Sequence, residues 1–112
     1  MRKLSITLLA AWAITFLALP VAAGNKSIWI DVRTSFEYSL GHVEGAHHIP
    51  YGDIERKVAA LTTDKDQEIH LYCRSGNRSG KALKTLLSMG YRNAHNDGGI
   101  NNLLHKAKLV NE

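Results

Sequence analysis

Residues 69–87 read IHLYCRSGNRSGKALKTLL and hold the only cysteine of the 112-residue chain, Cys73. The apolar run at 69–72 is typical of a short buried strand, and residues 79–87 indicate a helix. A cysteine between a strand end and a helix start faces backbone N–H groups and the positive end of the helix dipole. Such a setting binds anions and lowers a thiol pKa from about 8.5 to about 3.5–7.5. With Arg74 and Arg78 alongside, the sequence predicts a thiolate nucleophile in an anion-binding loop.

The alternative for Cys73 is a small buried core residue, because free cysteine packs like a hydrophobe. A core cysteine needs neither two arginines within five residues nor Gly76 and Gly80, which allow close backbone approach. We therefore favour the reactive thiol.

Short strands and helices alternate along the rest of the chain. Strands are expected at residues 28–32, 46–50 and 68–72, and a weak one at 93–96. Helices are expected at 35–40, from Asp53 to about 61, from 79 to a stop at Gly90, and at about 101–106, with a turn at Gly98-Gly99. This alternation predicts an α/β domain with a parallel sheet. Asp31 and Cys73 both fall at carboxyl ends of strands, where active residues of such sheets lie.

Local signals support these helices. Thr34 and Glu37 have the spacing of a capping box. Asp53 is a candidate N-cap for a helix whose core face carries Ile54, Val58 and Leu61. In the helix after the cysteine loop, the side chains expected to face inward are Ala82, Leu83, Leu86 and Leu87.

Residues 1–23 have the pattern of a cleavable signal peptide. Arg2 and Lys3 precede an uncharged apolar run from Leu4 to Leu19, and small residues follow up to Ala23. An uncleaved membrane anchor and a buried helix are the alternatives, although about 16 apolar residues are slightly few to span a bilayer. Cleavage after Ala23 would leave a single domain at residues 24–112.

The composition narrows the classes of partner. Without Arg2 and Lys3 the formal net charge falls from +4 to about +2, and the basic residues are scattered, so we expect no nucleic-acid binding. One cysteine excludes an internal disulfide, and a single cysteine in an exported protein suggests a reactive thiol or an intermolecular bridge. The anion-binding setting favours the reactive thiol. His42, His47 and His48 lie close together, but there is no second cysteine for a thiolate site. We expect no metal and no cofactor.

Three segments together resemble the rhodanese family. The segment at 31–50 (DVRTSFEYSLGHVEGAHHIP) resembles its N-terminal signature, residues 73–80 its active-site loop, and residues 86–91 with Gly98-Gly99-Ile100 its C-terminal signature. The likeness extends from about Ile28 to Leu104. Together with the export signal and the small size, it is similar to the phage-shock-type periplasmic members, which implies a periplasmic location.

The resemblance implies a three-layer α/β domain with a small, mostly parallel sheet flanked by helices. Family members usually carry one more strand and helix before the strand that ends at Asp31, so a four-stranded sheet is expected here. The family often has a tryptophan at about Leu103, and its absence here removes packing area rather than chemistry.

The resemblance also implies a thiosulfate sulfurtransferase in which Cys73 carries a persulfide and cyanide or a small thiol accepts the sulfur. The implied substrate-binding residues form one segment: Arg74, Ser75, Gly76, Asn77, Arg78 and Ser79. Asp31 is either a solvated strand-end carboxylate or the partner of an arginine, Arg78 or Arg33, that fixes the loop. Arg33 is otherwise a surface residue. The protein is expected to be a monomer with no stable membrane association after signal cleavage.

The sequence leaves two other functions open. Cysteine phosphatases and arsenate reductases also combine a cysteine, backbone amides and an arginine, but their loops have five residues between cysteine and arginine. Here four residues separate Cys73 from Arg78, which favours a cradle for a sulfur atom. A non-catalytic persulfide carrier or binding module is the second alternative, although such modules usually lose the cysteine.

Overall fold

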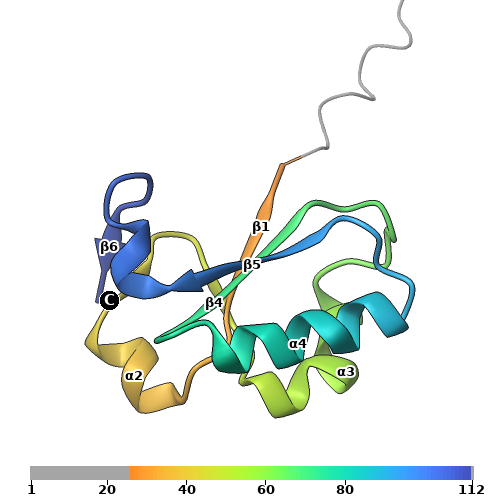
Figure 1. Cartoon of the computed structure of the whole chain (residues 1–112), viewed down its shortest axis with the longest axis horizontal. Helices are drawn as coiled ribbons and strands as arrows, with labels where there is room; N and C mark the ends of the chain where they lie inside the picture. Colours follow the sequence, from red (N-terminus) through yellow and green to blue (C-terminus); the bar gives the residue numbers. More distant parts are fainter. Residues whose placement is uncertain (1–25, 112) are drawn as a thin grey trace, which may run out of the picture.

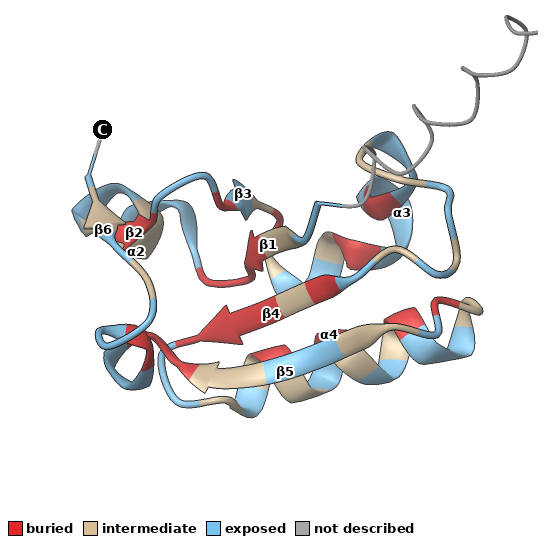
Figure 2. Cartoon of the chain, turned by 90° about the horizontal axis from the view of Figure 1, so that it is seen from above, coloured by how far each residue is buried: buried red, intermediate tan, exposed pale blue. Residues whose placement is uncertain are grey.

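The computed structural model describes residues 26–111, and the proposed signal peptide at 1–23 lies outside them. The central sheet has four parallel strands in the order β3-β1-β4-β5: His47–His48, Ile28–Asp31, Ile69–Cys73 and Ala94–Gly99. Figure 1 labels β1, β4 and β5, and Figure 2 labels all four strands. This arrangement confirms the expected α/β fold with a four-stranded parallel sheet. A separate antiparallel pair, which the sequence analysis missed, joins β2 (His42–Val43) to β6 (Leu109–Val110).

Within residues 26–111, five helical segments connect or cover the strands. They are α2 (Ser35–Leu40), η3 (Tyr51–Asp53), α3 (Ile54–Lys57) continued by η4 (Val58–Ala60), α4 (Asn77–Ser88) and η5 (Ile100–Leu103). None of the helices within residues 26–111 is long and apolar enough to cross a membrane.

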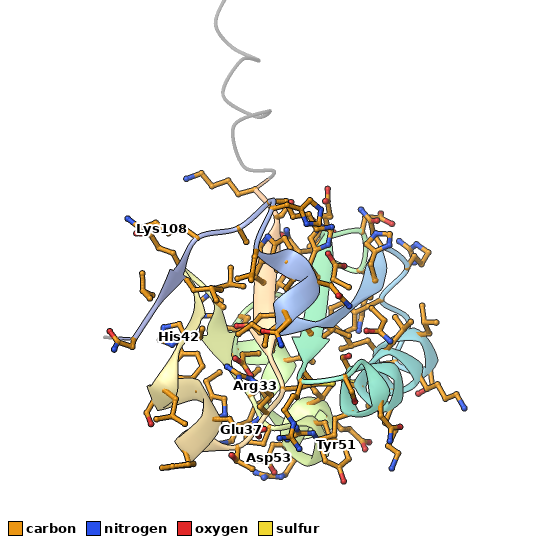
Figure 3. All side chains as sticks on the ribbon, turned by 60° about the vertical axis from the view of Figure 1, so that its left-hand side comes forward. Arg33, Glu37, His42, Tyr51, Asp53 and Lys108 are labelled. Atoms are coloured by element: carbon orange, nitrogen blue, oxygen red, sulfur yellow. The ribbon has the colours of Figure 1, made fainter. Side chains whose placement is uncertain are left out.

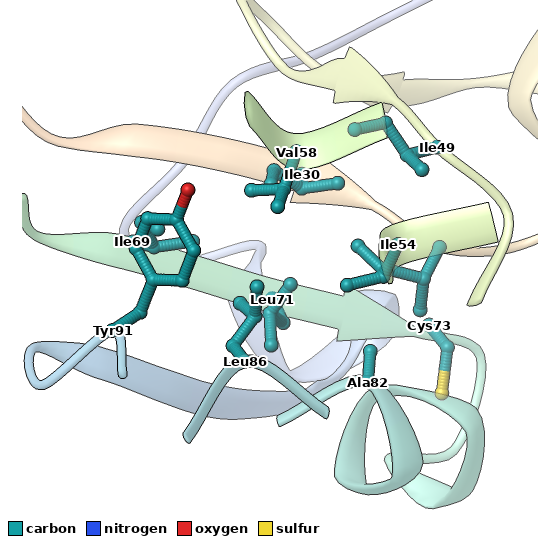
Figure 4. Close-up of a cluster of buried hydrophobic side chains, with 11 residues drawn as sticks. Ile30, Ile49, Ile54, Val58, Ile69, Leu71, Cys73, Ala82, Leu86 and Tyr91 are labelled. Carbon is teal, nitrogen blue, oxygen red and sulfur yellow. The ribbon is translucent and has the colours of Figure 1, made fainter. Parts of the chain in front are cut away.

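The main core lies between the sheet and the helices α3 and α4. Alternate residues of β4 (Ile69, Leu71 and Cys73) point into it, because successive side chains of a strand face opposite sides of the sheet. Ile54 and Val58 from α3–η4 and Ala82 and Leu86 from α4 meet them (Figure 4). Cys73 therefore sits at the edge of a packed core.

A second, smaller core covers the opposite face of the sheet. It joins Tyr72 of β4 to Leu103 of η5 and to Val43 of β2, all buried. In Figure 2, β4 is buried along most of its length, whereas β5, at the edge of the sheet, is mostly exposed or half-buried. Apolar cover on both faces is what the central position of β4 requires.

Several expected boundaries were wrong. The cysteine strand includes Cys73, and α4 begins at Asn77 instead of residue 79. Strand β5 continues through the glycine pair that was expected to be a turn, with a register shift opposite Leu71–Cys73. The last helical segment is a short 3-10 helix at Ile100–Leu103 rather than a helix at 101–106.

Two side-chain predictions were also wrong. Leu87 is half exposed, because α4 packs on the sheet through a narrow stripe that includes Ala82 and Leu86. Asp53 makes no side-chain capping hydrogen bond, because a 3-10 turn precedes α3; its carboxylate pairs with Arg56 and Lys57 instead. The capping box of Thr34 and Glu37 is confirmed, with both reciprocal hydrogen bonds present.

Candidate active site around Cys73

Cys73 is the last residue of the central strand β4, and its side chain is fully buried. Three residues, Arg74 to Gly76, lead from it to α4. Gly76 precedes the helix with φ +98°, a left-handed conformation that glycine adopts without strain. Since α4 starts at Asn77, the cradle consists of a three-residue loop and the first turn of a helix, not a six-residue loop.

The Cys73 sulfur lies against hydrogen-bond donors from the loop and from the first turn of α4. The Gly76 N–H donates to Sγ over 3.0 Å, and the Ser79 Oγ lies 3.4 Å from Sγ. Burial alone would raise the pKa of Cys73. The hydroxyl of Ser79 and the backbone N–H groups of Ser79, Ser75 and Gly76 outweigh it, so the pKa falls to about 7. The lowered pKa therefore makes the thiolate available near neutral pH without a general base.

The two arginines of the loop have different surroundings. Arg78 binds Glu37 through two parallel hydrogen bonds of 2.8 and 3.1 Å, and its side chain is one-quarter exposed. Arg74 is 76 % exposed and its Nε lies 3.9 Å from the same carboxylate. Hydrogen bonding from Arg78, helped by Thr34, lowers the pKa of Glu37 to about 2 despite its partial burial. Arg74 is thus the freer cation.

Asp31 pairs with Arg33, which decides between the two expected arginine partners. The Arg33 Nη2 lies 2.7 Å from Asp31 Oδ2, and its Nε is 3.0 Å from both carboxylate oxygens. Both residues are buried, so Asp31 is not a solvated carboxylate and Arg33 is not a surface residue. Arg33 also donates to the Gly41 carbonyl at the end of α2 over 2.6 Å. The pair therefore joins β1 to the helix that carries Glu37, and Figure 3 shows Arg33 and Glu37 on the same side of the molecule.

The glycine pair of β5 packs directly beneath the cysteine loop. A Cβ on Gly99 would collide with the backbone carbonyl of Arg74, and one on Gly76 would lie 3.3 Å from the Gly98 Cα. The loop therefore rests on bare backbone at this edge of the sheet.

Sequence reasoning missed two residues of this site. Glu37 was identified only as a helix cap, and its contact with Arg78 spans 41 positions that no local pattern reveals. Asn96 of β5 hydrogen bonds to Ser79 and to the Gly76 carbonyl. The only sequence signal for Asn96 was its place two positions before Gly98-Gly99, the glycine pair whose backbone comes close to the loop.

Three of the histidines make contacts away from the Cys73 sulfur. His70 lies on the sheet face opposite Cys73, stacks on Trp29 and bonds to Glu68 and Asp97. His42 and His48 bond to the carbonyls of Tyr38 and Arg33. Among residues 26–111, no three His, Cys, Asp or Glu side chains are grouped so as to hold a metal ion.

Comparison with known proteins gives consistent results. Residues 17–106 match the family described as Rhodanese-like domain. Thiosulfate sulfurtransferase PspE of Escherichia coli (strain K12) is 38% identical over 95 residues, which cover 85% of this chain and 88% of that protein. The tRNA uridine(34) hydroxylase of Yersinia enterocolitica is 34% identical over 87 residues, but the chain spans only 25% of its length.

Solved structures share the fold. One described as a rhodanese with anions from E. coli has a TM-score of 0.73 and 33% identity, covering 78% of this chain and all of that one. A rhodanese-related protein from Thermoplasma volcanium has a TM-score of 0.64 and 28% identity, covering 77% of this chain and 85% of that one.

Proposed function

The chain belongs to the rhodanese-like domain family, and we propose that it is a sulfurtransferase that moves the outer sulfur of thiosulfate through a persulfide on Cys73. The observation that carries this proposal is the environment of the Cys73 sulfur. The sulfur lies at a strand end with donors from Gly76 and Ser79, and the pKa of Cys73 is about 7. The likeness to the thiosulfate sulfurtransferase of E. coli, over most of both chains, supports the choice of donor.

The proposed reaction has two displacements. The Cys73 thiolate attacks the outer sulfur of thiosulfate; a new S–S bond forms, the S–S bond of thiosulfate breaks, and sulfite leaves with the electron pair. Cyanide or a thiolate then attacks the terminal sulfur of the persulfide, and the Cys73 thiolate is restored. Charge is conserved in each step, and neither step requires a separate general base.

The first turn of α4 and the loop before it are proposed to bind the anions. Amides from Arg74 to Ser79, Asn77 included, are proposed to hold the terminal sulfur, and the charges of Arg74 and Arg78 to attract thiosulfate and sulfite. Because Cys73 has no exposed surface, we propose that the short loop at 74–76 shifts to admit the donor. Asp31 and Arg33 support this arrangement through α2.

The test is thiocyanate formation from thiosulfate and cyanide by residues 24–112 and by the Cys73→Ser variant. Serine preserves size but not thiolate chemistry, so we expect the variant to be inactive at an unchanged melting temperature. Equal activity of the two proteins would exclude Cys73 as the nucleophile.

A parallel assay with an aryl phosphate addresses the phosphatase alternative. In that chemistry the arginine must bind the transferred oxyanion, whereas here Glu37 already engages both terminal nitrogens of Arg78. Turnover of the aryl phosphate without thiosulfate activity would overturn the sulfurtransferase proposal. A protein that accepts sulfur onto Cys73 but releases it only to a protein thiol would be a persulfide carrier.

We also propose that the protein is exported to the periplasm and acts there as a monomer. The support for export is the charge and apolar pattern of residues 1–23. The amino-terminal residue of protein isolated from a periplasmic fraction is the measurement. Gly24 is expected there, and Met1 would contradict cleavage.

A further inference from the structure

Asn96 of β5 forms hydrogen bonds with two residues that surround the Cys73 sulfur. Its Oδ1 accepts a hydrogen bond from the Ser79 hydroxyl over 2.7 Å, and its Nδ2 donates to the Gly76 carbonyl over 3.0 Å. Oδ1 also accepts from the Gly98 N–H over 2.9 Å, which fixes the side chain on its own strand. Ser79 and Gly76 are the residues whose O–H and N–H lie against the Cys73 sulfur.

The backbone around Asn96 leaves room for this arrangement. Gly80 lies in the first turns of α4, where glycine weakens a helix. A Cβ at that position would come within 3.4 Å of the Asn96 Nδ2. The missing side chain therefore lets the amide group lie close against the helix.

We propose that Asn96 is a positioning residue that holds the Ser79 hydroxyl and the Gly76 peptide in place to stabilise the Cys73 thiolate. It acts through these two residues and makes no contact of its own with the sulfur. The inference rests on the proposed role of Cys73 as a thiolate nucleophile, and extends it to a residue on another strand.

The Ser79 hydroxyl has one proton and two neighbouring acceptors, Asn96 Oδ1 and Cys73 Sγ. When Cys73 is a thiol, the hydroxyl donates to Asn96 and can accept from the S–H group. When Cys73 ionises, the hydroxyl turns its proton to the sulfur. Asn96 keeps the Ser79 oxygen beside the sulfur in both states. In the ionised state, its Oδ1 also competes with the thiolate for the hydroxyl proton.

These two effects have opposite signs. If positioning dominates, removal of the amide lets Ser79 and the loop leave the sulfur, and the Cys73 pKa rises. If competition dominates, removal frees the hydroxyl proton for the thiolate, and the pKa falls. The direction of the shift therefore separates the two roles.

The test is the pH dependence of iodoacetamide alkylation, which reports on Cys73 alone because the chain has no other cysteine. We expect Asn96→Ala to raise the midpoint by about one unit, which at pH 7 lowers the thiolate fraction, and the rate with it, about fivefold. Simple loosening of the loop would instead raise the plateau rate at high pH and leave the midpoint where it was.

The matched control is Asn93→Ala, an amide just before the opposite end of β5 that bonds to Asp66 and His95. Its midpoint is expected to equal that of the unmodified protein. If Asn96→Ala does not fold, Asn96→Leu, which keeps the number and branching of the side-chain heavy atoms without the amide or a charge, is compared with Asn93→Leu.

Ser79→Ala completes a double-mutant cycle. If Asn96 acts through Ser79, the two midpoint shifts together are smaller than the sum of the single shifts. A midpoint for Asn96→Ala that is unchanged or lower, or shifts that simply add, would overturn the proposal. Alkylation is measured without thiosulfate, so a protein that transfers no sulfur but shows the expected shifts would contradict the proposed function alone.

Discussion

The chemistry at Cys73 depends on a small number of polar contacts whose partners come from three elements, α4 with the loop before it, α2 and β5. Donors from the loop (Gly76) and the first turn of α4 (Ser79) stabilise the sulfur. Glu37 of α2 holds Arg78, and Asn96 of β5 hydrogen bonds to Gly76 and Ser79. Arg74 alone among the charged residues of this loop points largely into solvent. The two loop arginines should therefore respond differently to substitution.

Arg74→Ala is expected to reduce kcat/KM for thiosulfate about fivefold or less, because an exposed charge contributes about 0.2–1 kcal/mol. The activity should also become less sensitive to salt, with the melting temperature unchanged. Steady-state kinetics at two ionic strengths measure this. Arg92→Ala, an exposed arginine paired with Asp66, is the control and should change neither quantity.

Glu37→Gln tests the ion pair with Arg78 through pH. The pKa of Glu37 is lowered to about 2 in the folded protein, so its stabilising contribution is fully present above about pH 4.5 and is lost as pH falls toward 2. Urea midpoints of the two proteins should differ most at pH 6 and converge on acidification. The exposed Glu44→Gln serves as control, and a difference independent of pH would contradict the assignment.

At the scale of elements, the site is the junction of β4, the loop, α4 and the glycine pair of β5. The first turn of α4 lies at the site because Gly76, with φ +98°, lets the chain pass from β4 to the helix through a loop of only three residues. The register shift between β4 and β5 brings Gly99 opposite Cys73. Close approach of two backbones there leaves no space for a side chain.

Gly99→Ala is expected to destabilise the protein by about 1–3 kcal/mol, because its Cβ would overlap the Arg74 carbonyl and force the backbone apart. Sulfur transfer should fall with it, since the displaced loop carries the donors to Cys73. Urea denaturation and the thiocyanate assay measure the two effects. Gly52→Ala, whose Cβ would meet no atom within 4 Å, is the control; an equal loss there would argue against a specific clash.

On the scale of the whole molecule, two cores of different size hold the central strand from either side. The larger one lies under α3 and α4, and the smaller one joins β4 to η5 and to the β2–β6 pair. Tyr72, next to Cys73 in the chain, belongs to the smaller core and accepts a hydrogen bond from the Val43 N–H over 2.9 Å. The smaller core thus supports the strand end from the face that lacks α4.

Leu103→Ala probes this smaller core. Leu103 is 1 % exposed, so loss of its side chain should cost about 2–5 kcal/mol of unfolding free energy. Its neighbour Leu104 is 60 % exposed, and Leu104→Ala should change stability by no more than about 0.5 kcal/mol. Matching effects of the two substitutions in urea denaturation would show that η5 does not cover the sheet as described.

Features that depend on neighbouring residues were readable from the sequence alone. The strand–cysteine–helix order, the capping box of Thr34 and Glu37, and the burial of Ile54 and Val58 follow from periodicity and short-range hydrogen bonds. The small parallel sheet followed from the alternation of elements, and its four strands from the resemblance of three motifs to one family. Local chemistry was sufficient for these because each is decided within a few residues.

The tertiary structure decided what depends on distant pairing. It brought Glu37 to Arg78, Asn96 to Ser79, and β6 to β2, contacts that span 41, 17 and more than 60 positions. It also shows that Asp31 pairs with its near neighbour Arg33 and not with the distant Arg78, and that α4 begins at Asn77. Charges and amides have no periodicity that identifies their partners; only the register of packed strands and helices places them within hydrogen-bonding distance.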